Sequence, residues 1–153
     1  KGSGRRATVL GTAFKANTDD VRDSAALTII PLLVEAGVTV TAHDPKARHV
    51  TERHVKGISW SNCPYEATRG ADVVVILTEW DDYARLDLER LSRSMAGRSV
   101  IDCRNLFKPQ DVTRHGLKYI SIGRSAAAPV LKINSKRAGA GNGKWNEIAA
   151  APV

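Results

Sequence analysis

Two cationic side chains, Lys15 and Arg22, lie in a polar loop where a phosphate could bind. The loop follows a short apolar strand over residues 7–10 and starts at Gly11, which permits a sharp turn. An apolar helix comes next, and a helix N-terminus beside the carboxyl end of a parallel strand favours an anion. The spacing alone is weak support for a phosphate site, because Lys and Arg in a loop are usually solvated.

This loop differs from a standard dinucleotide-binding loop. The G-x-G-x-x-G fingerprint is missing, since Ala13 stands where the second glycine would be. Ser24, or Asp23 just before it, is expected to cap the helix over residues 25–35. The local sequence therefore predicts a strand, a polar loop and a capped helix, without fixing the ligand.

The two cysteines, Cys63 and Cys103, form neither a metal-ligand pattern nor a disulfide framework, so we assign no metal site. Cys103 stands between Asp102 and Arg104, where a neighbouring guanidinium can lower the pKa of a thiol and make it reactive. The alternative is a small residue that ends a buried strand, and we prefer that interpretation. Cys63 precedes Pro64 at an expected helix start and is interpreted as loop packing.

Strands and helices alternate along the chain. This alternation predicts an α/β fold, a Rossmann-like three-layer domain with a parallel sheet of about six strands. Right-handed crossovers would gather the carboxyl ends of the strands along one edge, with Leu10 near the central switch point. We expect ligand-binding groups at that edge. The expected strands are 7–10, 38–43, 58–60, 72–77, 99–102 and 118–122, and the longer expected helices are 25–35 and 86–95.

Composition fits a globular domain followed by a tail. The chain has 153 residues, of which 42% are hydrophobic and 25% charged, and no apolar run approaches the roughly 18 residues of a membrane span. We expect a domain over residues 1–125 and a flexible or artificially added tail over 126–153, where Ala, Gly, Lys and Asn prevail. The start K-G-S-G-R-R is no signal peptide, so a cytoplasmic location is expected.

The net charge of +7 gives little support for nucleic-acid binding. Much of the excess lies in the tail, where four Lys and Arg face a single Glu. The body of the chain mixes both signs, and no basic run is interleaved with aromatic residues. A moderate positive charge also suits an anionic small molecule such as a sugar nucleotide.

Three blocks of the sequence carry a family resemblance. They read G-T-A-F-K-A-N-T-D-D-V-R-D-S at 11–24, A-D-V-V-V-I-L-T-E-W-D-D-Y at 71–83, and V-I-D-C-R-N-L-F at 100–107. In order and distance they resemble the C-terminal, UDP-binding domain of the UDP-glucose/GDP-mannose dehydrogenase family. The resemblance spans residues 7–124, and three ordered blocks are far more specific than one motif.

The resemblance implies roles for four side chains. Phe14 and Lys15 match a Phe-Lys pair that approaches the UDP-sugar, and Arg104 matches an arginine that reaches the nucleotide. Arg22 matches an arginine that faces the phosphates of the cofactor NAD across a domain interface. Planar guanidinium groups suit bidentate phosphate contacts, whereas Lys15 is a flexible point charge.

Each of these cations also has a simpler interpretation. Lys15 would be solvated, and Arg22 would pair with Asp19 or Asp20 of its own loop. Arg104 would pair with Asp102. We prefer the ligand-binding roles because of the family resemblance.

The resemblance also implies part of a larger enzyme. Members of the family oxidise a primary alcohol of a nucleotide-sugar to a carboxylate in two NAD-dependent steps, through intermediates bound to a cysteine. That cysteine and the main NAD-binding fold belong to N-terminal and central domains that this sequence lacks. We therefore assign no catalytic residue and expect the isolated chain to be inactive.

The expected partners follow from the same resemblance. They are a UDP-sugar or another nucleotide-sugar, and the N-terminal and central domains of the same enzyme, which is expected to be a homodimer when full length. Neither nucleic acid nor a membrane is expected as a partner. The alternative is a standalone nucleotide-binding or protein-interaction module without catalysis.

Overall fold

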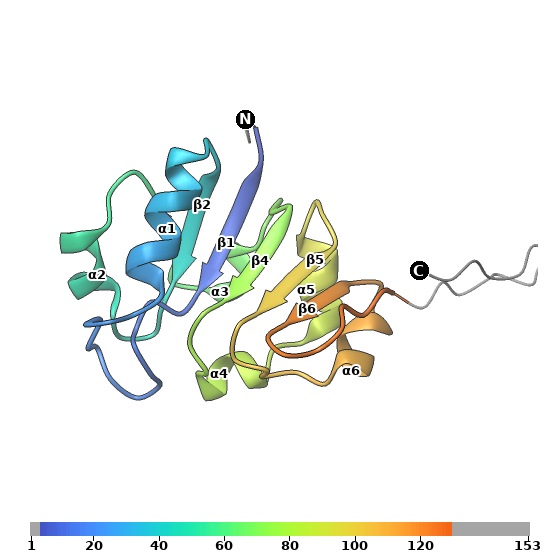
Figure 1. The fold of residues 1–153 in the computed structure, drawn as a ribbon. Helices are drawn as coiled ribbons and strands as arrows, with labels where there is room; N and C mark the ends of the chain where they lie inside the picture. The colour runs from blue at the N-terminus through green and yellow to red at the C-terminus, as the bar shows by residue number, and fades with distance from the viewer. Residues whose placement is uncertain (1–3, 130–153) are drawn as a thin grey trace, which may run out of the picture.

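The computed structural model describes residues 4–129, which form one sheet flanked by helices (Figure 1). All six strands run parallel, in the order β3-β2-β1-β4-β5-β6. This order confirms the predicted Rossmann-like sheet and places the switch point between β1 and β4. The strands are β1 (Arg6–Leu10), β2 (Thr39–His43), β3 (Ser59–Trp60), β4 (Val73–Ile76), β5 (Ser99–Asp102) and β6 (Lys118–Ser121).

Short helices connect the strands and complete the three layers (Figure 1). Only one of them, α1, is long enough to make nearly three turns. The helices are α1 (Ala26–Glu35), α2 (Arg48–His54), α3 (Pro64–Ala67), α4 (Asp81–Ala84), α5 (Leu88–Ser94) and α6 (Pro109–Thr113).

The two faces of the sheet bury separate hydrophobic clusters. On one face, Val9 and Val40 belong to a cluster with Ile30 of α1. On the opposite face, strands β1, β4, β5 and β6 pack against α5 and α6. Parallel strands covered on both sides hold their carboxyl ends rigidly, which favours a well-ordered site at that edge. The second cluster includes Leu10, Val74, Ile76, Leu91, Val100, Val112 and Tyr119.

The helix expected over residues 86–95 is shorter in the structure, where α5 spans Leu88–Ser94 and a separate turn precedes residue 86. A single turn, α4, comes first, and α5 begins only at Leu88. Asp87 is the N-cap of α5, because its carboxylate accepts hydrogen bonds from the backbone N–H groups of Glu89 and Arg90. This N-cap sets the start of α5 and leaves Leu86 outside the helix.

Backbone pairing extends beyond residue 125, the expected domain boundary. Ala127 and Tyr119 exchange two backbone hydrogen bonds of 2.8 Å as an antiparallel bridge beside β6. Most of the expected tail, residues 130–153, lies outside the described residues, so the division at 125 stays a prediction. Within residues 4–129, no helix is both long enough and apolar enough to cross a membrane.

Candidate functional site

The turn after β1, residues 11–15, lies at the switch point and approaches the end of β4 closely. Gly11 adopts a positive φ of 91°, and a Cβ atom there would lie 2.5 Å from the Cβ of Thr78. A residue with a side chain would therefore meet both backbone strain and a steric clash. The glycine is needed for the contact between β1 and β4.

Asp44, the first residue after β2, holds this turn from one side. Its Oδ2 accepts hydrogen bonds from the backbone N–H groups of Thr12 (2.7 Å) and Ala13 (3.0 Å), and its Oδ1 from those of Lys46 (2.9 Å) and Ala47 (2.7 Å). The indole N–H of Trp80 is a further, longer donor at 3.3 Å. One buried carboxylate thus connects the loops after β1, β2 and β4.

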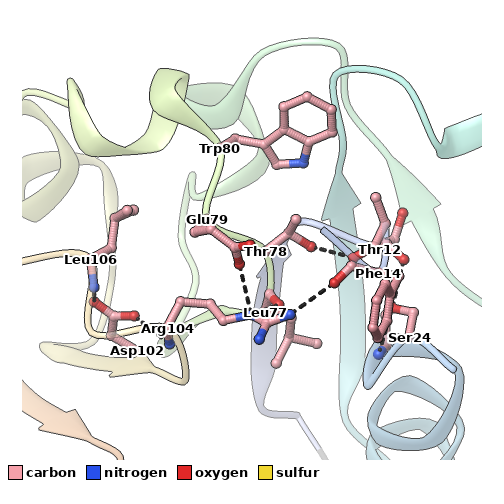
Figure 2. A network of polar contacts seen from close by, with 12 residues as sticks. Thr12, Phe14, Ser24, Leu77, Thr78, Glu79, Trp80, Asp102, Arg104 and Leu106 are labelled. Carbon is pink, nitrogen blue, oxygen red and sulfur yellow. Dashed lines mark hydrogen bonds and ion pairs between the residues drawn. The ribbon is translucent and has the colours of Figure 1, made fainter. Parts of the chain in front are cut away.

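Side chains from other elements bind the carbonyl oxygens of the same turn (Figure 2). The hydroxyl of Ser24 donates to the oxygen of Thr12 at 2.7 Å, and Thr78 Oγ1 donates to the oxygen of Ala13 at 2.7 Å. Arg104 Nη2 donates to the oxygen of Phe14 at 2.9 Å. Backbone groups bonded on both sides make the turn a fixed platform.

Phe14 and Lys15 project from that platform. Phe14 is 47% exposed, although its backbone N–H and carbonyl are both hydrogen-bonded. Lys15 is also exposed, and within residues 4–129 no carboxylate lies at ion-pair distance from it. The structure thus exposes an apolar residue and a lysine without a close ion pair at successive positions of the carboxyl edge.

Arg104, the second residue after β5, reaches the platform across β4 (Figure 2). Its Nε donates to the carbonyl oxygen of Leu77 at 2.9 Å and lies 2.9 Å from Oε2 of Glu79. Sequence reasoning offered Asp102 as the ionic partner, and that alternative is wrong, because the guanidinium pairs with Glu79 instead. Phe14, Lys15 and Arg104 are brought together at one edge, as the parallel sheet predicts.

Asp102 is unavailable to the guanidinium because backbone groups occupy its carboxylate. It accepts hydrogen bonds from the backbone N–H groups of Arg104, Leu106 and Phe107 at 2.9, 2.8 and 3.1 Å. The Tyr119 hydroxyl donates to it at 2.7 Å, and burial together with this carboxylate raises the pKa of that tyrosine. Asp102 therefore shapes the loop that carries Arg104 rather than balancing its charge.

Arg22 makes no direct contact with the other three residues among the described contacts, and its side chain is 87% exposed. Its partner Asp20 adjoins the platform, since the Asp20 carbonyl accepts a hydrogen bond from the backbone N–H of Phe14 at 2.8 Å. Its guanidinium makes a forked contact with Asp20, with Nη2 2.7 Å from Oδ2 and Nε 3.0 Å from Oδ1. The side-chain hydrogen bond from Arg22 lowers the pKa of Asp20 to about 2, so this pair is charged throughout the neutral range. The simpler interpretation of Arg22, a pair within its own loop, is what the structure contains.

Ala25 directly precedes α1 and makes no side-chain cap, but Ser24, rather than Asp23, binds the first backbone N–H of the helix. The Ser24 hydroxyl accepts a hydrogen bond from the backbone N–H of Ala26 at 3.2 Å, while Asp23 adopts a left-handed φ of 60°. The same hydroxyl donates to the turn after β1. Ser24 thus ties the start of the helix to the platform.

The turn after β1 does not fit the pyrophosphate of a dinucleotide. In G-x-G-x-x-G folds, the backbone N–H groups at this turn and the helix N-terminus bind that anion. Here Asp44 occupies the N–H groups of Thr12 and Ala13, and Gly11 N–H donates to the carbonyl of His43. A protein carboxylate thus stands where a phosphate would bind, and this turn does not fit the NAD pyrophosphate.

Cys103, the remaining candidate for chemistry, has a structural role. Burial raises the pKa of the Cys103 thiol and the Asp102 carboxylate raises it further, against the lowering effect of Arg104. Cys103 therefore fits the interpretation as a small residue at a strand end, and it packs against the cluster under α1. No group of three or more His, Cys, Asp or Glu side chains within residues 4–129 is arranged to hold a metal ion.

Two residues that organise the platform, Asp44 and Thr78, were expected at the carboxyl edge but were not among the predicted site residues. Both directly follow predicted strands, and polar residues at the carboxyl ends of parallel strands are the available signal for such positions. Sequence reasoning missed a hollow of about 280 Å³ beside the platform. The hollow is lined by Asn17, Pro45, Lys46, Trp80, Asp81, Asp82 and Arg85.

Comparison with known proteins agrees with this architecture. A sequence model described as the UDP-glucose/GDP-mannose dehydrogenase family, UDP binding domain, matches residues 8–109. The chain is 40% identical over 121 residues to UDP-glucose 6-dehydrogenase of Rhizobium meliloti, covering 79% of this chain and 28% of that protein. It is 35% identical over 130 residues to UDP-glucose 6-dehydrogenase of Pseudomonas aeruginosa, covering 81% of this chain and 29% of that protein.

Solved structures give the same result. An NDP-N-acetyl-D-galactosaminuronic acid dehydrogenase from Methanosarcina mazei matches with a TM-score of 0.71 at 29% identity, over 81% of this chain and 26% of that one. A UDP-glucose dehydrogenase from Pyrobaculum islandicum matches with a TM-score of 0.63 at 31% identity, over 84% of this chain and 26% of that one. The chain thus spans less than a third of the length of these relatives. It belongs to the UDP-glucose/GDP-mannose dehydrogenase family, and it corresponds to the UDP-binding domain of that family.

Proposed function

We propose that this chain is the C-terminal, substrate-binding domain of an NAD-dependent nucleotide-sugar dehydrogenase that converts UDP-glucose to UDP-glucuronate. The proposal assigns Phe14, Lys15 and Arg104 to the nucleotide-sugar. The observation that supports it best is the fixed turn after β1, which presents Phe14 and Lys15 to solvent within a chain that matches a UDP-binding domain. Relatives named UDP-glucose 6-dehydrogenase favour UDP-glucose over other nucleotide-sugars.

The geometry gives each residue a distinct task. Lys15 has no ionic partner within the described residues, so its full charge is available to a phosphate oxygen. Arg104 uses Nε and Nη2 on backbone carbonyls, which leaves its Nη1 side for a ligand. Phe14 offers an apolar surface for a sugar or base. Because the backbone beneath these groups is already ordered, binding would cost little conformational entropy.

In the complete enzyme, NAD would supply the hydride acceptor for oxidation of the substrate alcohol. The turn after β1 does not fit a dinucleotide, so we assign NAD to another domain of the enzyme. Arg22 as a contact to the NAD phosphates across a domain interface stays a prediction, and it requires the guanidinium to exchange or share its partner Asp20. Homodimerisation through the other domains and a cytoplasmic location belong to the same proposal.

Lys15→Ala is expected to weaken binding of UDP-glucose to the purified chain about two- to fivefold, the effect of losing one charge contact at an exposed site. Isothermal titration at low and high salt measures this, and salt should weaken wild-type binding more than binding by the variant. Lys56→Ala is the matched control, since Lys56 is equally a lysine on the surface but lies just beyond α2. Equal affinities for the wild type and Lys15→Ala would contradict the assignment, and a wild-type chain that binds no nucleotide-sugar would favour the protein-interaction module.

The isolated chain is expected to reduce no NAD when UDP-glucose is supplied. It contains no cysteine that matches the family nucleophile, and the thiol pKa of Cys103 is raised rather than lowered. Absorbance of NADH at high protein concentration is the measurement. Turnover that is lost in Cys103→Ser would overturn this expectation and make Cys103 a catalyst.

A further inference from the structure

One edge of the Arg104 guanidinium is committed to the protein itself. Nε donates to the carbonyl oxygen of Leu77 at the end of β4, and Nη2 donates to that of Phe14 in the turn after β1. These two carbonyls belong to different loops on either side of the switch point. Arg104 therefore joins the two loops, and it fixes the residue directly before Lys15.

Glu79 lies against this guanidinium without forming a hydrogen bond to it. Its Oε2 is 2.9 Å from Arg104 Nε, yet the N–H of that nitrogen is directed at Leu77. Among the described residues, Oε2 is a buried oxygen with no hydrogen-bond partner. A buried carboxylate oxygen without a donor is costly, so the nearby positive charge is what compensates it.

Charge therefore explains this contact better than hydrogen bonding does. The side chains of Arg104 and Glu79 are 36% and 42% exposed, which leaves the attraction partly screened but not abolished. A carboxylate at one side of the guanidinium restricts the rotation that a long arginine side chain otherwise retains. In this orientation, Nη2 of Arg104 donates to the carbonyl oxygen of Phe14 (Figure 2).

We propose that Glu79 is a positioning residue that acts through Arg104. Its charge holds the guanidinium across β4, and the guanidinium in turn holds the Phe14 carbonyl, so that Phe14 and Lys15 stay in place for the nucleotide-sugar. This inference rests on the proposed function of the same site. It gives Glu79 a role that neither the motif match nor the family comparison assigns.

A first experiment needs no ligand. In wild type, the Nε–H proton of Arg104 is expected to exchange slowly with water in ¹⁵N NMR spectra of the chain, because it is hydrogen-bonded. Glu79→Ala and Glu79→Gln should both speed that exchange, since neither retains the charge. Glu79→Asp keeps the charge one methylene further back and should lie closer to wild type than Glu79→Gln.

A second experiment measures the coupling between Glu79 and Arg104 through the affinity for UDP-glucose. Glu79→Gln is expected to weaken UDP-glucose binding about two- to fivefold in the wild-type background, the range for a partly exposed ion pair. In the Arg104→Ala background the same substitution should change affinity by less than the error, because its effect passes through Arg104. Glu89→Gln is the matched control, since Glu89 pairs with Arg93 on α5 at 2.6 Å and is similarly exposed.

The outcomes separate this inference from the proposed function. Unchanged Nε–H exchange in both uncharged Glu79 variants would overturn the positioning role, whatever the affinities are. Equal affinity losses in the two backgrounds would overturn it as well, because Glu79 would then act independently of Arg104. If the wild-type chain binds no nucleotide-sugar, the proposed function fails, and the exchange measurement still decides whether Glu79 holds Arg104.

Discussion

Asp44→Ala is expected to lower the free energy of unfolding by about 3 to 5 kcal/mol. The substitution leaves four backbone N–H groups without their acceptor, those of Thr12, Ala13, Lys46 and Ala47. An unsatisfied buried donor costs about 1 to 3 kcal/mol, and water entering the vacated space reduces the sum. The loss should appear in urea denaturation as a lower midpoint with an unchanged slope.

Two further variants serve as controls for this measurement. Asp44→Asn keeps one acceptor oxygen and should recover part of the loss, because one of the two pairs of N–H groups stays satisfied. Asp81→Ala removes an exposed aspartate at the start of α4 and should change stability by less than about 0.5 kcal/mol. A similar stability for Asp44→Ala and Asp81→Ala would mean that the Asp44 hydrogen bonds do not hold the three loops together.

The sheet was predictable because each strand has a local signature. Apolar runs such as residues 73–77 are typical of buried strands in a chain of alternating strands and helices, and connections between parallel strands are right-handed. The switch point beside Leu10 followed from the same topology. The structure confirms these predictions, with strand ends that differ by one residue or so.

The contacts of the site were not predictable, because their partners are distant in sequence. Asp44 binds backbone groups more than thirty residues before it, and no local pattern records that pairing. For Arg104, sequence reasoning could offer only the nearest carboxylate, Asp102. The structure shows that carboxylate filled by backbone N–H groups, so the guanidinium turns to Glu79, which follows a different strand.

The helix boundaries near residue 86 illustrate a different limit. An apolar stripe predicts a helix wherever its spacing allows one, so Leu86 and Leu88 seem equivalent in the sequence. The N-cap at Asp87 decides between them, since its carboxylate accepts two backbone hydrogen bonds that a continuous helix would not leave free. Capping residues therefore deserve the same weight as periodicity in sequences of this kind.

Arg104→Ala is expected to weaken binding of UDP-glucose by about 1.5 to 3 kcal/mol, the range for a hydrogen bond that involves a charged group. The variant loses the ligand contact proposed for the Nη1 side and also the bond from Nη2 that holds Phe14. Arg104→Lys should recover only part of the affinity, because one ammonium group cannot reproduce contacts to two carbonyls and a ligand.

Arg22→Ala is the contrasting variant in this experiment, since Arg22 is also an arginine at the carboxyl edge but pairs within its own loop. It should leave the affinity for UDP-glucose nearly unchanged, because the Arg22 side chain bonds only to the carboxylate of Asp20 among the described residues, whereas Asp20 meets the turn through its backbone carbonyl, which accepts from the Phe14 N–H at 2.8 Å. Isothermal titration of the three variants, with a thermal melt of each, measures both binding and folding. If Arg104→Ala and Arg22→Ala lost the same affinity, or if the loss in Arg104→Ala only followed its lower melting temperature, Arg104 would be a residue for stability rather than for the nucleotide-sugar.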